Sequence, residues 1–377
     1  MIPSERAPVS GRAQSRRRLR TTEPIRAEST SLALGAAGAV VGLVVGLVLL
    51  RGTAPLSGPG SIGQIAALST LAVSGLVAAC SLAVLAPRRH PWMRALPWWR
   101  RALAVLGPAL VYAVLAFLLT GAMFAVLQQA FLGVALDRFA STFWVSASTG
   151  AWAYVVGAGA AALDGRSLAT LLMVFLTVGV LSAAMLSPDP YWWERFFSEL
   201  GAGSDQAGLT FNLTLLVTGL AFIAVGDFLA HDLGLWARET GEPFWKVRVV
   251  HATLVVLGAH LALVALISLN VSKYWHNVVA ETLVVVFGLA LLLFPELLRR
   301  LPGGLLLFTG IAFGILVMLI VMFDVVGYLN MTAFEMGAAV TVYVWLLLLI
   351  RTVSAAGDST RALAEATLHD QGPDLAR

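Results

Sequence analysis

Long apolar runs alternate with short polar segments along most of the chain. A helix needs about 20 apolar residues to cross the roughly 30 Å hydrocarbon core of a bilayer. Ten runs meet this requirement, and they fall near residues 31–50, 62–86, 102–127, 142–163, 167–186, 208–230, 247–268, 279–298, 304–328 and 334–350. The pattern therefore predicts an all-α polytopic membrane protein with about ten transmembrane helices.

Composition agrees with this prediction. Apolar residues make up 59% of the chain and charged residues 12%, whereas soluble proteins average roughly half and a quarter. Arginine outnumbers lysine, which occurs only as Lys246 and Lys273, and Ala, Gly, Leu and Val are abundant. This usage is typical of a high-GC bacterium, so we expect a bacterial plasma (inner) membrane protein. The lone Cys80 has no second cysteine with which to form an internal disulfide.

Basic residues are distributed unevenly between the two predicted sides of the membrane. If the N-terminus is cytoplasmic, only four of the 25 basic residues lie outside, namely Arg51, Arg138, Arg195 and Lys273. Positive charge in short loops concentrates on the cytoplasmic side, so both termini are predicted to be cytoplasmic. This orientation also explains the net charge of +4, and we expect no nucleic-acid partner.

The polar segments divide the chain into four predicted regions. Residues 1–30 are rich in arginine and lack an apolar period, which predicts a disordered basic cytoplasmic tail. The link Asp164-Gly165-Arg166 separates a four-helix block, 31–165, from a six-helix block, 166–351, which carries nearly all the polar residues inside spans. Residues 352–377 are predicted to form a second cytoplasmic tail.

Two segments of the first part carry packing or anchoring signals. Gly38, Gly42 and Gly46 lie on one stripe of the first span, where a neighbouring helix can approach closely. A packing face within the chain is favoured over a seam between two copies. Residues 87–101 mix arginine with tryptophan, which is typical of an anchor at the inner membrane interface, with an anionic-lipid headgroup site as the alternative.

The most unusual segment is 187–212, SPDPYWWERFFSELGAGSDQAGLTFN, between two spans. We expect Ser187 or Asp189 to cap a short helix whose aromatic side chains lie in the headgroup layer. Gly201 and Gly203 then let the chain turn sharply into the bundle. This outer loop is expected to carry Glu199 over a cavity.

Polar side chains inside spans are costly and mark candidate sites. With 1.5 Å of rise per residue, His260 lies roughly 12 Å and Asp324 about 6 Å below the outer ends of their spans. Together with residues at other outer span ends and in the outer loop, they predict a polar cavity that opens outward. The predicted ligand-binding residues are Ser198, Glu199, Gly201, Asp205, Asn212, His260, His276, Glu281, Asp324 and Glu335.

Three interpretations of this outer group remain: a structural hydrogen-bond network, a ligand or lipid-headgroup site, or a catalytic metal site. No HExxH or similar motif supports metal binding, and we predict no metal ligands and assign no cofactor. Haem is disfavoured because His251 and His260, nine residues apart, lie on opposite helix faces. A smaller inner group, Asp227, His231, Asp232 and His251, is best explained as an interface ion pair.

The residues Phe197-Ser198-Glu199-Leu200-Gly201-Ala202, followed by Phe211-Asn212, resemble the bacterial domain-of-unknown-function family 998 (DUF998). Its members are six-helix membrane proteins similar to the DRAM-like group, and the resemblance covers roughly 167–350. It implies an outer loop that folds back over the bundle, with Ser198, Glu199, Gly201 and Asn212 as signature positions. It implies no reaction, and distant relatives that act around membrane lipids favour a lipid ligand.

The favoured function is binding of a lipid, an amphiphile or a partner at the outward-facing cavity. The alternatives are an intramembrane lipid-modifying enzyme that uses the His and acid cluster, with a carboxylate as general base or metal ligand, and a small-molecule transporter. The sequence leaves open whether the protein is an enzyme. The expected partners are membrane lipids, with a protein partner or a homo-oligomer as the alternative.

Overall fold

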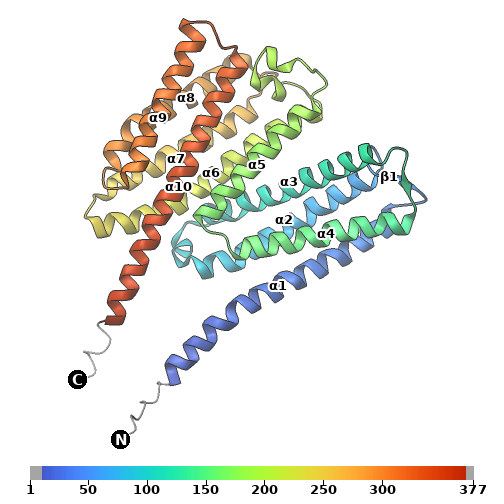
Figure 1. Ribbon diagram of the computed structural model, residues 1–377, viewed down its shortest axis with the longest axis horizontal. Coiled ribbons are helices and arrows are strands. Elements are labelled where there is room, and N and C mark those ends of the chain that lie inside the picture. The colour runs from blue at the N-terminus through green and yellow to red at the C-terminus, as the bar shows by residue number, and fades with distance from the viewer. Residues whose placement is uncertain (1–10, 371–377) are drawn as a thin grey trace, which may run out of the picture. The chain divides into compact units, whose positions relative to one another are not determined.

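The computed structural model describes the backbone of residues 11–370 and the side chains of residues 25–359. The all-α prediction is confirmed, since ten α-helices make up almost the whole described chain (Figure 1). They are α1 (Gly11–Leu49), α2 (Ile62–Arg89), α3 (Trp98–Ala130), α4 (Arg138–Ala161), α5 (Gly165–Leu186), α6 (Gln206–Thr240), α7 (Phe244–Leu266), α8 (Lys273–Leu297), α9 (Gly303–Ile320) and α10 (Met331–Asp370).

Short elements occupy the connections. They comprise the 3-10 helices η1 (Pro91–Ala95), η2 (Trp192–Glu194) and η3 (Phe197–Gly201), the π-helical turn η4 (Val321–Val325), and the strands β1 (Ala54–Pro55) and β2 (Ala135–Leu136). The two strands form a minimal antiparallel ladder in which Ala54 pairs with Leu136.

Within the described part, nine helices are long and apolar enough to cross a membrane, so the prediction of a multi-pass membrane protein is confirmed. Helix α4, which occupies the predicted span 142–163, is not among the nine. Its small and hydroxyl-bearing residues, such as the Ser-Ala-Ser-Thr-Gly run at 146–150, make it less apolar than the other helices. The orientation of the termini stays a prediction.

Packing divides the chain into two compact units. The first comprises the described residues up to Leu85 together with Thr120–Ala162, and the second comprises Ala86–Leu119 and the described residues from Leu163 onward. The second unit therefore also includes the first part of α3, which the expected boundary at residue 165 assigns to the first block. This part of α3 packs closely on α6, because a Cβ added to Gly107 would lie 3.2 Å from the Cα of Ala221.

The glycine stripe of α1 packs on α4 inside the first unit. A Cβ added to Gly38 would lie 2.5 Å from the Cβ of Ala153, and one added to Gly42 would lie 2.8 Å from the Cα of Ser146. No side chain fits in such a close helix contact. The Ser146 hydroxyl also donates to the Ala39 carbonyl, at 2.8 Å. The stripe thus serves packing within the chain.

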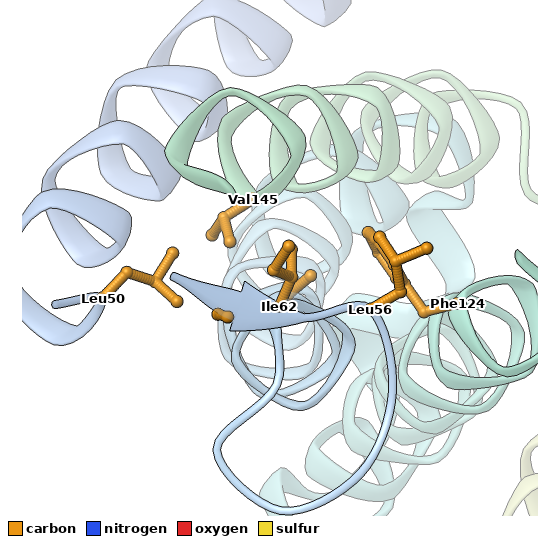
Figure 2. Packing of buried hydrophobic residues seen from close by; sticks show 7 residues of the cluster. Leu50, Leu56, Ile62, Phe124 and Val145 are labelled. Atoms are coloured by element: carbon orange, nitrogen blue, oxygen red, sulfur yellow. The ribbon is translucent and has the colours of Figure 1, made fainter. Parts of the chain in front are cut away.

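A small apolar core closes the end of the first unit near β1. Figure 2 shows its buried side chains gathered beside this strand, namely Leu50, Leu56, Ile62, Phe124 and Val145. Ile62, Phe124 and Val145 are fully buried, and they come from α2, α3 and α4.

Helices extend into both segments that were expected to be loose tails. Helix α1 begins at Gly11, and α10 continues to Asp370. Arginine, alanine and leucine, which are frequent in these segments, are all strong helix formers. A helix can therefore continue beyond the end of its apolar span. Residues 1–10 and 371–377, which also belong to the predicted tails, lie outside the described residues.

The helices of the second unit run back and forth between two ends. One end holds the aromatic loop, residues 187–205 between α5 and α6, and the link from α9 to α10 (Figure 1). We call it the aromatic-loop end. The other, the arginine end, holds residues 86–101 and the link from α6 to α7. Both ends expose aromatic side chains, Tyr191, Trp193, Tyr274, Trp275 and Tyr328 at the first, and Trp98, Trp99, Phe244 and Trp245 at the second, as expected at two membrane interfaces.

Candidate functional site

A cavity of about 280 Å³ lies inside the second unit, between α5, α6, α7, α8 and α10. Its wall is almost entirely apolar, and the only polar side chains in it belong to Thr177, Thr218 and Tyr343. The Thr218 hydroxyl is already used, since it donates to the Thr214 carbonyl at 2.7 Å. The cavity therefore suits an apolar molecule.

One side of the cavity is buried and the other is exposed. Leu215 and Phe222 of α6 and Leu257 of α7 form a buried floor. Leu181 of α5 and Val340 of α10, by contrast, are 58% and 57% exposed. In a helix that crosses a bilayer, exposed apolar side chains of this kind meet lipid rather than water. Leu181 and Val340 thus form an exposed apolar rim of the cavity on α5 and α10.

The aromatic loop covers the cavity through Phe197, which is part of the wall. The Phe197 ring packs edge-on against Phe211 of α6, with centroids 5.2 Å apart, and lies 6.4 Å from the Trp192 ring. Leu200 of the same loop is buried in a cluster with Ala183 and with residues of α6 and α7. The loop is therefore part of the core at this end, and its position sets the shape of the cavity.

Glu335, in the first turn of α10, holds the loop in this position. Its carboxylate accepts hydrogen bonds from the backbone N–H of Phe197, at 2.6 Å, and of Ser198, at 3.3 Å. The Ser198 hydroxyl donates to the other carboxylate oxygen, also at 3.3 Å. Hydrogen bonds to an ionised acceptor are roughly twice as strong as neutral ones. One side chain of α10 thus fastens the backbone of the residue that covers the cavity.

Three further predicted residues shape the turn from the loop into α6. The Asn212 side-chain amide donates to the Gly201 carbonyl at 2.9 Å. Gly201 has no room for a side chain, because an added Cβ would lie 2.5 Å from the Asn212 Oδ1. Asp205 caps α6 by accepting from the Gly208 N–H at 2.9 Å. Ser198, Gly201, Asp205, Asn212 and Glu335 therefore support the loop together.

Glu199 has a different role from the expected one. Its carboxylate pairs with Arg195 of the same loop at 3.0 Å, and it is not part of the cavity wall. Arg195 also pairs with Asp189, which accepts from the Tyr191 N–H at 2.9 Å. The Tyr191 N–H, and then Arg195, lower the pKa of Asp189 below its ordinary value. Arg195 therefore links the start of the loop to its middle at the surface.

The remaining four predicted residues do not come together at the cavity. His260 bonds to the Val256 carbonyl of its own helix, at 2.8 Å, and buried His276 bonds to the Ile267 carbonyl, at 2.7 Å. Glu281 and Asp324 are exposed. In the part of the chain that the structure describes, no three His, Cys, Asp or Glu residues are placed to hold a metal ion.

The expected polar cavity thus differs from the apolar one that the structure contains. Rise per residue gives the depth of a side chain in the membrane but not the neighbour that its helix face meets. Polar groups at similar depth were expected to surround a shared space. In the structure, several of them instead hold the loop above an apolar space.

A buried ion pair lies at the arginine end, and the sequence analysis named its aspartate and histidine but missed its arginine. Arg100 of α3 pairs with Asp227 of α6, whose side chain is only 3% exposed. His251 of α7 approaches the same carboxylate oxygen at 2.9 Å. This link joins three helices, whereas the sequence placed Asp227 with His231 on one helix face. The His231 ring stacks on Trp92 at 4.8 Å. An arginine just before a predicted span, near the inner end where another span carries an aspartate, is the signal that could have found it.

Residues 167–352 match the protein family described as "Protein of unknown function (DUF998)". The match confirms the family resemblance over the C-terminal half, from α5 into α10, and includes the aromatic loop and Glu335. No curated protein and no solved structure matches the chain.

Proposed function

We propose that this multi-pass protein binds an apolar chain of a membrane lipid or amphiphile in the cavity between α5 and α10. The observation that carries the proposal is an apolar cavity with a buried floor and an exposed apolar rim. A ligand dissolved in the bilayer can reach such a cavity from the side without crossing water. We place the protein in a bacterial plasma membrane with cytoplasmic termini, and so place the aromatic loop outside.

The size of the cavity limits the ligand. Pockets for small molecules measure about 300–1,000 Å³, and this cavity of about 280 Å³ lies just below that range. It is suited to one hydrocarbon chain or a small amphiphile rather than to both chains of a phospholipid. A chain that leaves the bilayer gains little from the hydrophobic effect, because lipid tails are equally apolar. Selectivity must then come from close packing and from polar groups at Thr177 and Tyr343.

Glu335 controls access to the cavity in this proposal. Its hydrogen bonds hold Phe197 in the wall. If they break, the loop can move and the cavity loses one of its walls. Binding and loop position are therefore coupled through one carboxylate.

Binding is favoured over catalysis by the chemistry of the wall. The lining residues include no His, Asp, Glu, Lys or Cys, which are the groups that most often act as general acid, general base or nucleophile. Thr177 and Tyr343 can orient a ligand by hydrogen bonding.

Photo-crosslinking tests the proposal. The full chain is reconstituted in nanodiscs that contain a phosphatidylcholine with a diazirine in one acyl chain, and labelled peptides are mapped by mass spectrometry. We expect labels on cavity residues of α5, α6 and α10. Val340→Trp, at the rim, should reduce this labelling at least fivefold. Leu307→Trp, on an α9 residue that is 68% exposed and outside the cavity wall, is the matched control.

Unchanged cavity labelling in Val340→Trp would contradict the proposal. So would labels spread evenly over all lipid-facing helices, because that pattern reports contact with bulk lipid only.

A further inference from the structure

Residues 86–101 at the arginine end form a second candidate site, separate from the cavity. The stretch contains five arginines and no Asp or Glu: Arg88, Arg89, Arg94, Arg100 and Arg101. It joins α2 to α3 and includes η1. A charge imbalance of this size in so short a segment attracts anions.

The apolar side of this segment is firmly anchored. Met93 is fully buried. The Trp92 ring stacks on His231 with an interplanar angle of 14° and meets Phe228 edge-on at 5.3 Å. His90 bonds to the Leu163 carbonyl at 3.2 Å. The backbone that carries the arginines is therefore ordered before any ligand arrives.

The five arginines fall into two groups. Arg100 is engaged by Asp227, and Arg101 donates to the carbonyls of Arg94, at 2.7 Å, and Leu96, at 3.3 Å. The guanidinium groups of the other three are exposed and make no ion pair with any acid among the described side chains; they belong to Arg88, Arg89 and Arg94. Three charges thus remain for an external anion.

Neighbouring tryptophans place these charges at headgroup level. Trp98 and Trp99, the first residues of α3, are 79% and 50% exposed. Tryptophan at such a position lies in the interfacial layer of a membrane. Arg94 precedes Trp98 by only four residues, and Arg88 and Arg89 end α2 at the same end of the unit, so the three arginines lie at the level of the lipid phosphates. Guanidinium matches a phosphate with two parallel hydrogen bonds, which a lysine ammonium cannot do.

We propose that Arg88, Arg89 and Arg94 form a binding site for the phosphate of an anionic phospholipid. The anchored Trp92 and Met93 hold the site in place, and Trp98 and Trp99 contact the same lipid layer. The site lies at the opposite end of the second unit from the aromatic loop, so it does not depend on the cavity.

Native mass spectrometry tests this site on the full chain. The delipidated protein in detergent is titrated with phosphatidylglycerol or phosphatidylcholine of the same chain length. We expect at least tenfold tighter retention of the first phosphatidylglycerol over phosphatidylcholine. The variant R88Q/R89Q/R94Q should bring this ratio close to one, and R88K/R89K/R94K should retain part of it.

Arg299→Gln is the matched control. Arg299 is exposed at the same end but pairs with Glu296, so its loss should leave the ratio within twofold of the wild-type value. Equal retention of both lipids by the wild type would overturn the proposal. A glutamine triple variant that keeps the preference would do so as well. An equal loss in Arg299→Gln would show general charge attraction instead of a site, and displacement of the lipid by millimolar inorganic phosphate would show a soluble occupant.

Discussion

The two ends of the second unit use a carboxylate in different ways. At the aromatic-loop end, Glu335 accepts from backbone N–H groups of a loop. At the arginine end, Asp227 pairs with Arg100 of α3 and with His251 of α7. Loss of Glu335 frees N–H groups near the surface, which water can satisfy. Loss of Asp227 leaves a cation partly buried without its partner, which is far more costly.

This difference assigns a separate role to each end. The Asp227 cluster joins α3, α6 and α7 and should mainly determine stability. The Glu335 hydrogen bonds position one covering residue, Phe197, and should mainly determine access to the cavity.

Asp227→Ala should destabilise the protein most. Removing one partner of a buried ion pair costs about 3–5 kcal/mol. The Arg100 side chain is 27% exposed, so we expect about 2–3 kcal/mol, since solvent screens part of the loss. Unfolding in detergent measures the free-energy change. Glu296→Ala, which removes an exposed pair with Arg299, is the control and should cost under about 1 kcal/mol. A smaller loss for Asp227→Ala than for the control would remove the contrast between the two ends.

Glu335→Gln should change the loop more than the global stability. An amide oxygen can still accept hydrogen bonds, but it lacks the charge, and about 1–2 kcal/mol of local stabilisation should be lost. Hydrogen exchange at Phe197 and Ser198 should therefore speed up about tenfold, and cavity photo-labelling should fall. Glu199→Gln, on the same loop but with Arg195 as its one ion-pair partner among the described side chains, should leave labelling unchanged. If both variants change cavity labelling to the same extent, Glu335 is not the residue that holds Phe197 over the cavity.

Asn212→Ala should have a smaller effect at the same end. It removes one hydrogen bond to the Gly201 carbonyl, which is worth about 0.5–1.5 kcal/mol. Exchange should accelerate around residues 200–208 but not at the arginine end. Asn270→Ala, in the α7–α8 link at the same end, serves as a control. Faster hydrogen exchange around Trp92 would show that the two ends are coupled and would contradict their separate roles.

Acidification should have the smallest effect, a loosening of the start of the aromatic loop. The pKa of Asp189 is lowered by the Tyr191 N–H and by Arg195, so its interactions are fully present above the ordinary pKa of about 4. They are lost as the pH falls through the lowered value. Exchange at Tyr191, corrected for its intrinsic pH dependence, should be constant from pH 7 to 5 and rise only in stronger acid. Asp189→Asn should abolish this acid step. A change near pH 6 would point to another group.

Much of the loop, but little of the cavity, followed from local sequence. Ser198, Gly201 and Asn212 stand out because glycine, serine and asparagine between two spans predict a tight, hydrogen-bonded turn. Glu335 stands out because a carboxylate at the start of a span is costly unless it has partners. The cavity wall could not be found in this way. Its residues, such as Leu215 and Val340, are ordinary apolar residues of their helices, and only the packing of five helices leaves a space between them.

The sequence by itself determined that this chain forms apolar helices long enough to span a membrane, where the turns between them lie, and which side chains are too polar to face lipid. These properties are local, because a helix satisfies its own backbone hydrogen bonds and its length follows from its apolar run. Only the tertiary structure decided which partners meet: Glu335 with a loop 137 and 138 residues away, and Asp227 with an arginine 127 residues away. Such pairings depend on the rotation of each helix about its axis, which is set by packing against its neighbours.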